Sequence, residues 1–113
     1  MPRKNTLLTA PPYAVEQALK RLGANLRTAR LRRNLTIADV AAKIGADRRT
    51  VSDAEKGKPY TNIAVYVALL WAFDLIGQVE TLADPAEDKE GQALALSREP
   101  QRARQSREMD NEF

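Results

Sequence analysis

A short run of hydrogen-bonding side chains stands out within the stretch RRTVSDAE, which begins at Arg48. Arginine pairs in a bidentate way with guanine, aspartate accepts a hydrogen bond from cytosine, and serine or threonine can contact either base. Val51 and Ala54 have helical spacing and would face inward, so the polar side chains would face outward. We therefore predict that DNA bases are read by Arg48, Arg49, Thr50, Ser52 and Asp53.

The individual roles within this run stay open. Neighbouring helical positions point about 100° apart, so either Arg48 or Arg49 would bind a phosphate instead of a base. Thr50 fits a phosphate or a thymine methyl group, and Asp53 would either accept from cytosine or pair with Arg49 one turn earlier. Contacts to backbone phosphates are predicted for Thr36, Lys43, Lys56 and Lys58.

Two short helices joined by a tight turn must position these side chains. Thr36 and Asp39 form a variant of the capping box at the start of the first helix, and Asp47 is a good N-cap for the second. Gly45 supplies the positive φ of the turn, and Gly57 ends the second helix. Two capped helices around one glycine turn form a helix-turn-helix pattern.

Three further helices are expected, over Tyr13–Arg33, Tyr60–Phe73 and Leu75–Leu82. The second of these is apolar nearly all round, and such a helix is buried on two sides. One small domain offers one core, so the other side predicts a homodimer. The predicted interface residues are Tyr66, Trp71, Leu75, Ile76, Val79 and Leu82.

The 113-residue chain is expected to form one domain, 13–83, between a flexible arm, 1–12, and a charged, disordered tail, 84–113. Residues 1–83 carry 13 Lys and Arg against 7 Asp and Glu, so their net charge is +6. Residues 84–113 carry 5 against 8, so their net charge is −3. The basic part predicts a polyanionic partner.

Composition argues against several classes of function. The chain contains no cysteine and no histidine, which removes the commonest metal ligands and the commonest general base. We therefore expect no enzyme activity, no metal and no cofactor. No apolar run approaches the roughly 20 residues that cross a membrane, and no signal-peptide core precedes the domain. A cytoplasmic protein associated with the nucleoid is expected.

Three motifs together carry a family resemblance. They are LGANL with Arg30, then LTIADVAAKIG, then RTVSDAEKGK, which begins at Arg49. In this combination they resemble the Cro/CI (Xre) helix-turn-helix family. The resemblance implies an all-α fold of five helices and binding of a homodimer to an inverted repeat in double-stranded DNA. It also implies an internal ion pair between Arg30 and Glu55.

Two positions depart from the family pattern. Ile37 stands where the family usually has glutamine or a similar polar residue that often supports a phosphate or base contact, so the resemblance implies that this contact is lost. Ala54 stands where the recognition helix often has a large apolar residue. Either the facing side chain is larger or the two helices pack closer together.

A narrower resemblance concerns the segment RRTVSDAEKG and the Leu-Ala-rich tail, which are similar to HipB-type antitoxins. It implies an antitoxin that represses its own operon and binds a HipA-like kinase toxin. The tail residues implied in toxin binding are Leu94, Leu96, Arg102 and Arg104. The alternative is a stand-alone phage-type repressor of the Xre family with no toxin partner.

Overall fold

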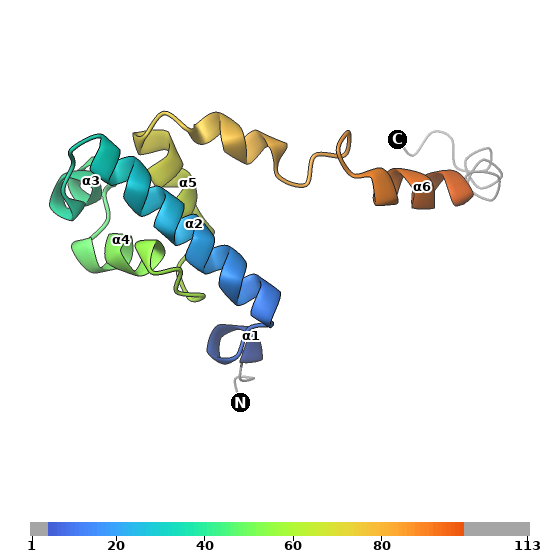
Figure 1. Cartoon of the computed structure of the whole chain (residues 1–113), viewed down its shortest axis with the longest axis horizontal. Helices are drawn as coiled ribbons and strands as arrows, with labels where there is room; N and C mark the ends of the chain where they lie inside the picture. Colours follow the sequence, from blue (N-terminus) through green and yellow to red (C-terminus); the bar gives the residue numbers. More distant parts are fainter. Residues whose placement is uncertain (1–4, 99–113) are drawn as a thin grey trace, which may run out of the picture. The chain divides into compact units, whose positions relative to one another are not determined.

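The structure is a computed structural model that describes residues 5–98, and it is all-helical over that range (Figure 1). The all-α prediction is confirmed for this part of the chain. The elements in order are α1 (Thr6–Thr9), α2 (Tyr13–Arg32), α3 (Ile37–Ile44), α4 (Arg48–Glu55), α5 (Ile63–Ala72), the 3-10 helix η1 (Ile76–Thr81) and α6 (Lys89–Ser97).

Local hydrogen bonds set the ends of α3 and α4 where the sequence predicts them. The Asp39 amide donates to Thr36 Oγ1 over 3.0 Å, and the Thr36 amide donates to Asp39 Oδ2 over 2.9 Å. Gly45 follows α3 with a left-handed φ of 74°. Asp47 then accepts the Thr50 amide over 2.8 Å and starts α4. Each bond satisfies a backbone group that the helix leaves unpaired.

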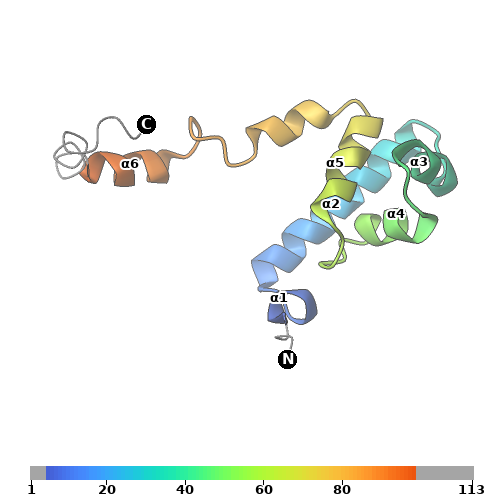
Figure 2. The same cartoon turned by 180° about the vertical axis from the view of Figure 1, so that it is seen from behind.

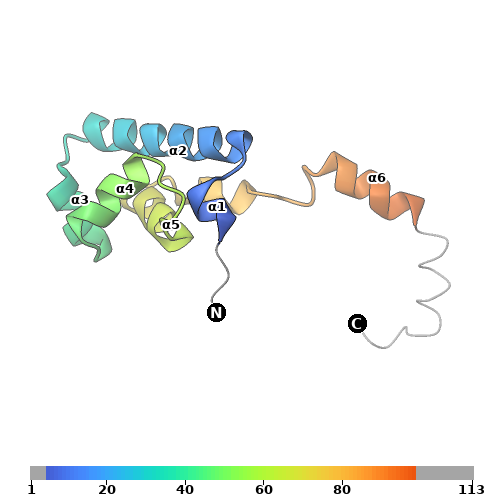
Figure 3. The same cartoon turned by 90° about the horizontal axis from the view of Figure 1, so that it is seen from below.

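Helices α2 to α5 bury one apolar core. Figure 3 shows α2 running along one side of the group formed by α3, α4 and α5, and Figure 2 shows the same arrangement from behind. Helix α4 packs against α2, α3 and α5. The largest fully buried side chains are Phe73, Leu26, Leu69, Val40 and Val51. Burying each of these side chains contributes about 1.5–3 kcal/mol. Because α4 packs against α2, α3 and α5, this shared core holds α4 in place.

Helix α2 approaches the end of α4 very closely at Gly23. A Cβ atom on Gly23 would lie 2.5 Å from the Glu55 carbonyl oxygen and 2.6 Å from that of Ala54. Ala54 itself is fully buried. Of the two ways to compensate for the small Ala54, the structure therefore shows closer packing of the helices.

The last predicted helix of the domain has 3-10 geometry. Over Leu75–Leu82 we expected a short helix, and the chain forms the 3-10 helix η1 there. Asp74 precedes it with a positive φ of 60°, which ends the α5 region and reorients the chain. The five helices expected between Tyr13 and Leu82 thus correspond to α2, α3, α4, α5 and η1.

Each of the two end segments contains a short helix. Helix α1 lies in the predicted arm, and α6 lies in the segment expected to be disordered. The chain divides into two compact units, Met1–Val79 and Glu80–Phe113, and α6 belongs to the second. Asp88 caps α6 by accepting the Gly91 amide, and Gln92 Nε2 donates to the carbonyls of Pro85 and Ala86. No residue of α6 is buried.

Candidate nucleic-acid interface

The outward face of α4 begins with two arginines. Arg48 and Arg49 occupy the first two positions of the helix, and both are exposed. The hydroxyl and the backbone amide of Thr50 lower the pKa of the Asp47 carboxyl, and the nearby charge of Arg49 adds a smaller effect. Asp47 is therefore ionised at neutral pH and holds the start of α4 in shape beside the two arginines.

Thr50 has a structural role that narrows its predicted contacts. Its hydroxyl donates to Asp47 Oδ1 over 2.7 Å, and the residue is half-buried. Because the hydroxyl proton is engaged within the turn, Thr50 does not have a free donor for a phosphate. Its methyl group remains available to a thymine methyl group.

Ser52 and Asp53 lie farther along α4, and both are half-buried. Within the described residues, no ion pair joins Asp53 to Arg49. Burial raises the pKa of the Tyr66 hydroxyl, and the charge of Asp53 raises it further. The charge of Asp53 therefore acts on Tyr66 of α5. Arg48 and Arg49 are more exposed than Ser52 and Asp53.

The four predicted phosphate ligands are all exposed: Thr36, Lys43, Lys56 and Lys58. Thr36 Oγ1 accepts the Asp39 amide at the start of α3, and this bond leaves the hydroxyl proton for an outside acceptor. Lys56 and Lys58 follow the C-terminal end of α4. The structure thus places cationic or hydroxyl donors before α3 and after α4.

Lys43, which was predicted to contact a phosphate, also contacts α5 of its own chain. Its ammonium donates to the Ala72 carbonyl over 3.2 Å and lies 5.6 Å from the centre of the Trp71 ring. The last carbonyls of a helix attract cations because they have no partner within the helix. Lys43 is therefore held at the end of α5.

Arg33 has a similar role that the sequence did not reveal. It donates to the carbonyls of Ala29 and Phe73, each over 2.9 Å, and lies 5.4 Å from the centre of the Phe73 ring. Arg33 and Phe73 are 40 residues apart, so no local pattern could have linked them. Arg33, the C-cap residue of α2, and Lys43 of α3 thus hold the C-terminal end of α5.

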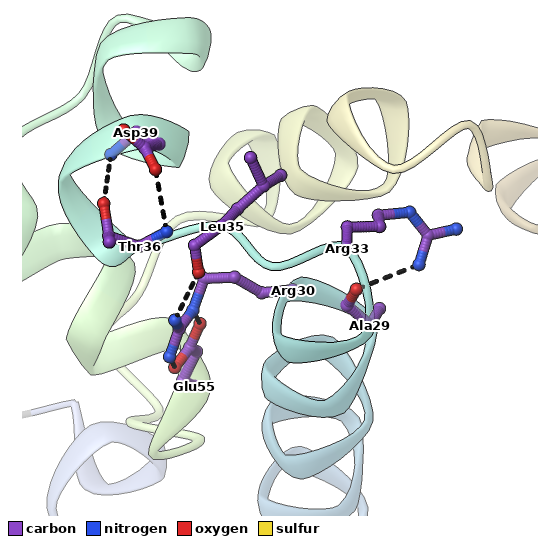
Figure 4. A network of polar contacts seen from close by, with 7 residues as sticks. All are labelled: Ala29, Arg30, Arg33, Leu35, Thr36, Asp39 and Glu55. Carbon is purple, nitrogen blue, oxygen red and sulfur yellow. Dashed lines mark hydrogen bonds and ion pairs between the residues drawn. The ribbon is translucent and has the colours of Figure 1, made fainter.

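A buried ion pair fixes α4 to α2. Figure 4 shows the Arg30 guanidinium facing Glu55, with Nε 2.7 Å from Glu55 Oε2 and a second nitrogen 3.0 Å from Oε1. A third nitrogen donates to the Leu35 carbonyl over 2.9 Å. The two side chains are only 8% and 6% exposed. The hydrogen bonds that Arg30 donates to Glu55 raise the pKa of Arg30, so the guanidinium stays charged. Helix α2, helix α4 and the segment before α3 are therefore joined at one point.

The predicted dimer residues divide into three groups. Tyr66 is a correction, because it is only 6% exposed and belongs to the core of its own chain. Leu75 and Val79 are half-buried, and Leu75 packs against that core. Trp71, Ile76 and Leu82 are 50%, 43% and 67% exposed. Only the last group offers a large free surface.

The predicted partner-binding residues of the tail are described only in part. Leu94 and Leu96 lie on α6 and are 53% and 65% exposed. Arg102 and Arg104 lie outside the described residues. Over residues 5–98, no group of three or more acidic side chains could hold a metal ion. No helix in this range is long and apolar enough to cross a membrane.

Two capped helices, joined at a left-handed glycine and packed beneath a third helix, define a helix-turn-helix protein. A comparison with known families agrees with this class. The family model described as "Helix-turn-helix domain" matches residues 21–83, more than half of the chain. The chain therefore belongs to this helix-turn-helix family, which is of the Cro/CI-like kind and indicates a DNA-binding regulator. Searches of curated proteins and of solved structures found no match.

Proposed function

We propose that the protein is a sequence-specific DNA-binding regulator of transcription whose helix α4 enters the major groove from its N-terminal end. One observation carries the proposal. The outer face of α4 begins with the exposed Arg48 and Arg49, while its inner face is held by the buried Arg30–Glu55 pair. A helix held in this way loses little freedom on binding, so its arginines reach the base edges at a small entropic cost.

The contacts divide by chemistry. Arg48 and Arg49 are the leading base readers, because a guanidinium matches the O6 and N7 acceptors of guanine. Thr36, Lys56 and Lys58 are exposed around α4 and would contact phosphates, which set affinity and register more than sequence preference. As a homodimer the protein would bind an inverted repeat with half-sites about 10 base pairs apart, or a multiple of that.

Arginine substitution tests the proposal directly. Arg48→Ala and Arg49→Ala are each expected to weaken operator binding by about 1–3 kcal/mol per half-site contact, and at least one should relax sequence preference. Lys56→Ala is the matched control, because loss of a phosphate contact should weaken binding to operator and random DNA alike. Titrations against both DNAs at fixed salt measure the difference. If both arginine variants lose affinity equally on the two DNAs, neither residue reads a base.

A second function, that of an antitoxin, has its own support. The segment RRTVSDAEKG and the tail resemble HipB-type antitoxins, and the second compact unit presents Leu94 and Leu96 with nothing packed over α6. In this proposal the protein represses its own operon at the nucleoid and binds a HipA-like kinase toxin. Without a toxin partner, it acts as a stand-alone phage-type repressor of the Xre family.

The neighbouring gene and its product separate these two functions. If that gene encodes a kinase-like protein, the product should co-purify with this chain and protect the tail in limited proteolysis. Leu94→Ala with Leu96→Ala should weaken that complex without changing operator binding. Equal cleavage of the tail with and without the kinase-like product would exclude capture by the tail.

A further inference from the structure

A tight turn after α4 fixes two exposed lysines. Lys56 is the C-cap of α4, and Gly57 follows it with a left-handed φ of 69°. The Gly57 amide donates to the Ala54 carbonyl over 3.0 Å. The Lys58 amide donates to the Asp53 carbonyl, also over 3.0 Å. These two bonds form a Schellman motif, so the backbone of Lys56 and Lys58 is held in place while both side chains stay exposed.

This turn lies directly against α2 (Figure 3). A Cβ atom on Gly57 would lie 2.6 Å from the Leu19 carbonyl oxygen and 2.7 Å from the Lys20 Cα. Successive Cα atoms are about 3.8 Å apart, so the Cα atoms of Lys56 and Lys58 each lie within about 8 Å of the Lys20 Cα. We call Lys20, Lys56 and Lys58 the lysine cluster.

Lys20 lies on the side of α2 that meets α4. Residues three positions apart share a helix face, so Lys20 lies on the same face as Gly23. Gly23 is the residue whose added Cβ would meet the last carbonyls of α4. The Lys20 side chain is 56% exposed, and its flexible stem lets the ammonium reach over the end of α4.

The lysine cluster carries more positive charge than its neighbours neutralise. Lys20 Nζ lies 3.0 Å from Glu16 Oε1 in a pair that is largely exposed, and such pairs are weak. Lys56 and Lys58 form no ion pair within residues 5–98. Three ammonium groups thus share one carboxylate, and this imbalance favours a polyanion as partner.

We propose that the lysine cluster binds neighbouring phosphates of the DNA backbone, with Lys20 as a contact supplied by α2 and Glu16 as an internal competitor for it. In the free protein Lys20 bonds to Glu16, and on DNA it exchanges this carboxylate for a phosphate. One strand carries a phosphate about every 3.4 Å along the axis, so a cluster about 8 Å across spans two or three of them. This inference rests on the proposed DNA binding and adds a contact from outside the helix-turn-helix motif.

The position of the lysine cluster favours DNA over an acidic protein. Helix α4 has 8 residues and is about 12 Å long, and the major groove is about 12 Å wide. With Arg48 and Arg49 at the base edges, the far end of α4 would lie where the phosphate backbone borders the groove. The lysine cluster occupies that end of α4.

Salt dependence tests the contact without knowledge of the operator, because phosphate binding is independent of sequence. The probe is a random-sequence duplex, titrated with full-length protein between about 50 and about 200 mM salt. Lys20→Ala should lower the slope of log affinity against log salt by about 0.9 for each bound copy. Its loss of affinity relative to the wild type should therefore shrink about 3.5-fold over this range. Alanine is the best helix former, so the variant should keep α2 intact.

Arg21→Ala is the matched control. It removes the same charge from the next residue of α2, which is exposed, forms no ion pair within residues 5–98 and points about 100° away from Lys20. This variant should leave the salt slope nearly unchanged. Lys20→Arg should also retain the wild-type slope, because it keeps the cation.

Glu16→Gln tests the competition for Lys20. It frees the ammonium and should tighten binding to the same duplex at low salt. In the Lys20→Ala background the same change should have little effect, because there is no ammonium to release. An equal gain in both backgrounds would mean that Glu16 acts through net charge alone, which would overturn the competition.

Two further outcomes would overturn the inference. They are an unchanged salt slope in Lys20→Ala, which would leave the lysine cluster to an acidic protein or to solvent, and an equal change of slope in Lys20→Ala and Arg21→Ala. Both outcomes require a wild type that binds DNA. A wild type that binds no DNA even at low salt would refute the proposed function itself, so the two failures are distinguishable.

Discussion

Helices α4 and α6 begin with the same kind of N-cap but differ in how much of each helix is buried. Each starts at an aspartate whose side chain accepts an amide three residues later, Asp47 from Thr50 and Asp88 from Gly91. They are 8 and 9 residues long. Helix α4 buries Val51 and Ala54, whereas α6 buries no residue.

The comparison separates what starts a helix from what holds it. A capping bond is local and depends on a few neighbouring residues. Most helical stability in proteins comes from packing of an apolar face against other elements. Helix α4 has such packing together with the ion pair to Arg30. Substitutions within α4 should therefore lower the unfolding free energy of the whole domain. Changes within α6 should remain local.

The largest expected effect comes from the ion pair. Glu55→Ala leaves the buried Arg30 guanidinium without its carboxylate and should cost about 3–5 kcal/mol of unfolding free energy. Urea unfolding followed by circular dichroism measures this. Glu90→Ala, in exposed α6, is the matched control and should have little effect.

A double variant tests whether charge or position matters at that site. Arg30→Met with Glu55→Leu removes both charges at similar volume, so it should recover most of the lost stability. It also loses the bond to the Leu35 carbonyl, which contributes about 1 kcal/mol. If Glu55→Ala alone leaves the unfolding curve in place, the pair does not hold α4.

A smaller loss is expected where α2 meets α4. Gly23→Ala adds a Cβ that meets the backbone carbonyls of Ala54 and Glu55, so it should cost about 1–3 kcal/mol. Gly91→Ala is the corresponding change in α6, where the added Cβ meets the Asp88 carboxylate and no backbone atom from another helix. Thermal unfolding should show a lower Tm for the first variant alone. Equal shifts would mean that α2 and α4 are not in close contact.

The two N-caps give the next contrast. Asp47→Ala removes the acceptor for the Thr50 amide and should lower the Tm by a few degrees, since α4 is part of the cooperative domain. Asp88→Ala removes an equivalent bond from α6 and should leave the Tm unchanged. Differential scanning calorimetry on both variants measures the contrast, and an equal loss from both would show that α6 unfolds together with the domain.

Acid titration checks the same cap through its charge. The pKa of Asp47 is lowered below its ordinary value of 3.8 by the hydrogen bonds from Thr50. The cap therefore contributes its full stability above about pH 4 and loses it as the pH falls through the lowered pKa. The hydrogen bonds with Thr36 lower the pKa of Asp39 as well, so the cap of α3 loses stability as the pH falls in the same way. Asp47→Asn keeps an acceptor without the charge, so its Tm should depend less on pH in this range.

The smallest effect is expected from removing the tail. Deleting residues 84–113 should leave the Tm of the first unit nearly unchanged, because no α6 residue is buried and the unit ends at Val79. Operator affinity at low salt should be equal or slightly higher, since the deleted segment has a net charge of −3. A drop of several degrees in Tm would show that the second unit stabilises the first.

Local features of this protein were predictable from the sequence. The capping box at Thr36, the turn at Gly45 and the cap at Asp47 each involve groups within about four residues, so the residue types nearly determine their geometry. The exposure of Arg48 and Arg49 follows from the same helical spacing that buries Val51 and Ala54. The partner of Glu55 was reached through family resemblance, because Arg30 lies 25 residues away.

Only the tertiary structure decided how the helices meet. Position 23 has no room for a side chain, because α2 passes over the last carbonyls of α4 there. Lys43 and Arg33 donate to carbonyls at the end of α5, which the fold brings within their reach. Tyr66 faces inward and leaves Ile63 and Trp71 outside, since an apolar helix without charges shows no pattern that distinguishes its two sides. The physical reason is distance along the chain. Hydrogen bonds between near neighbours are encoded in residue type, whereas contacts across 20 to 40 residues depend on where whole helices pack.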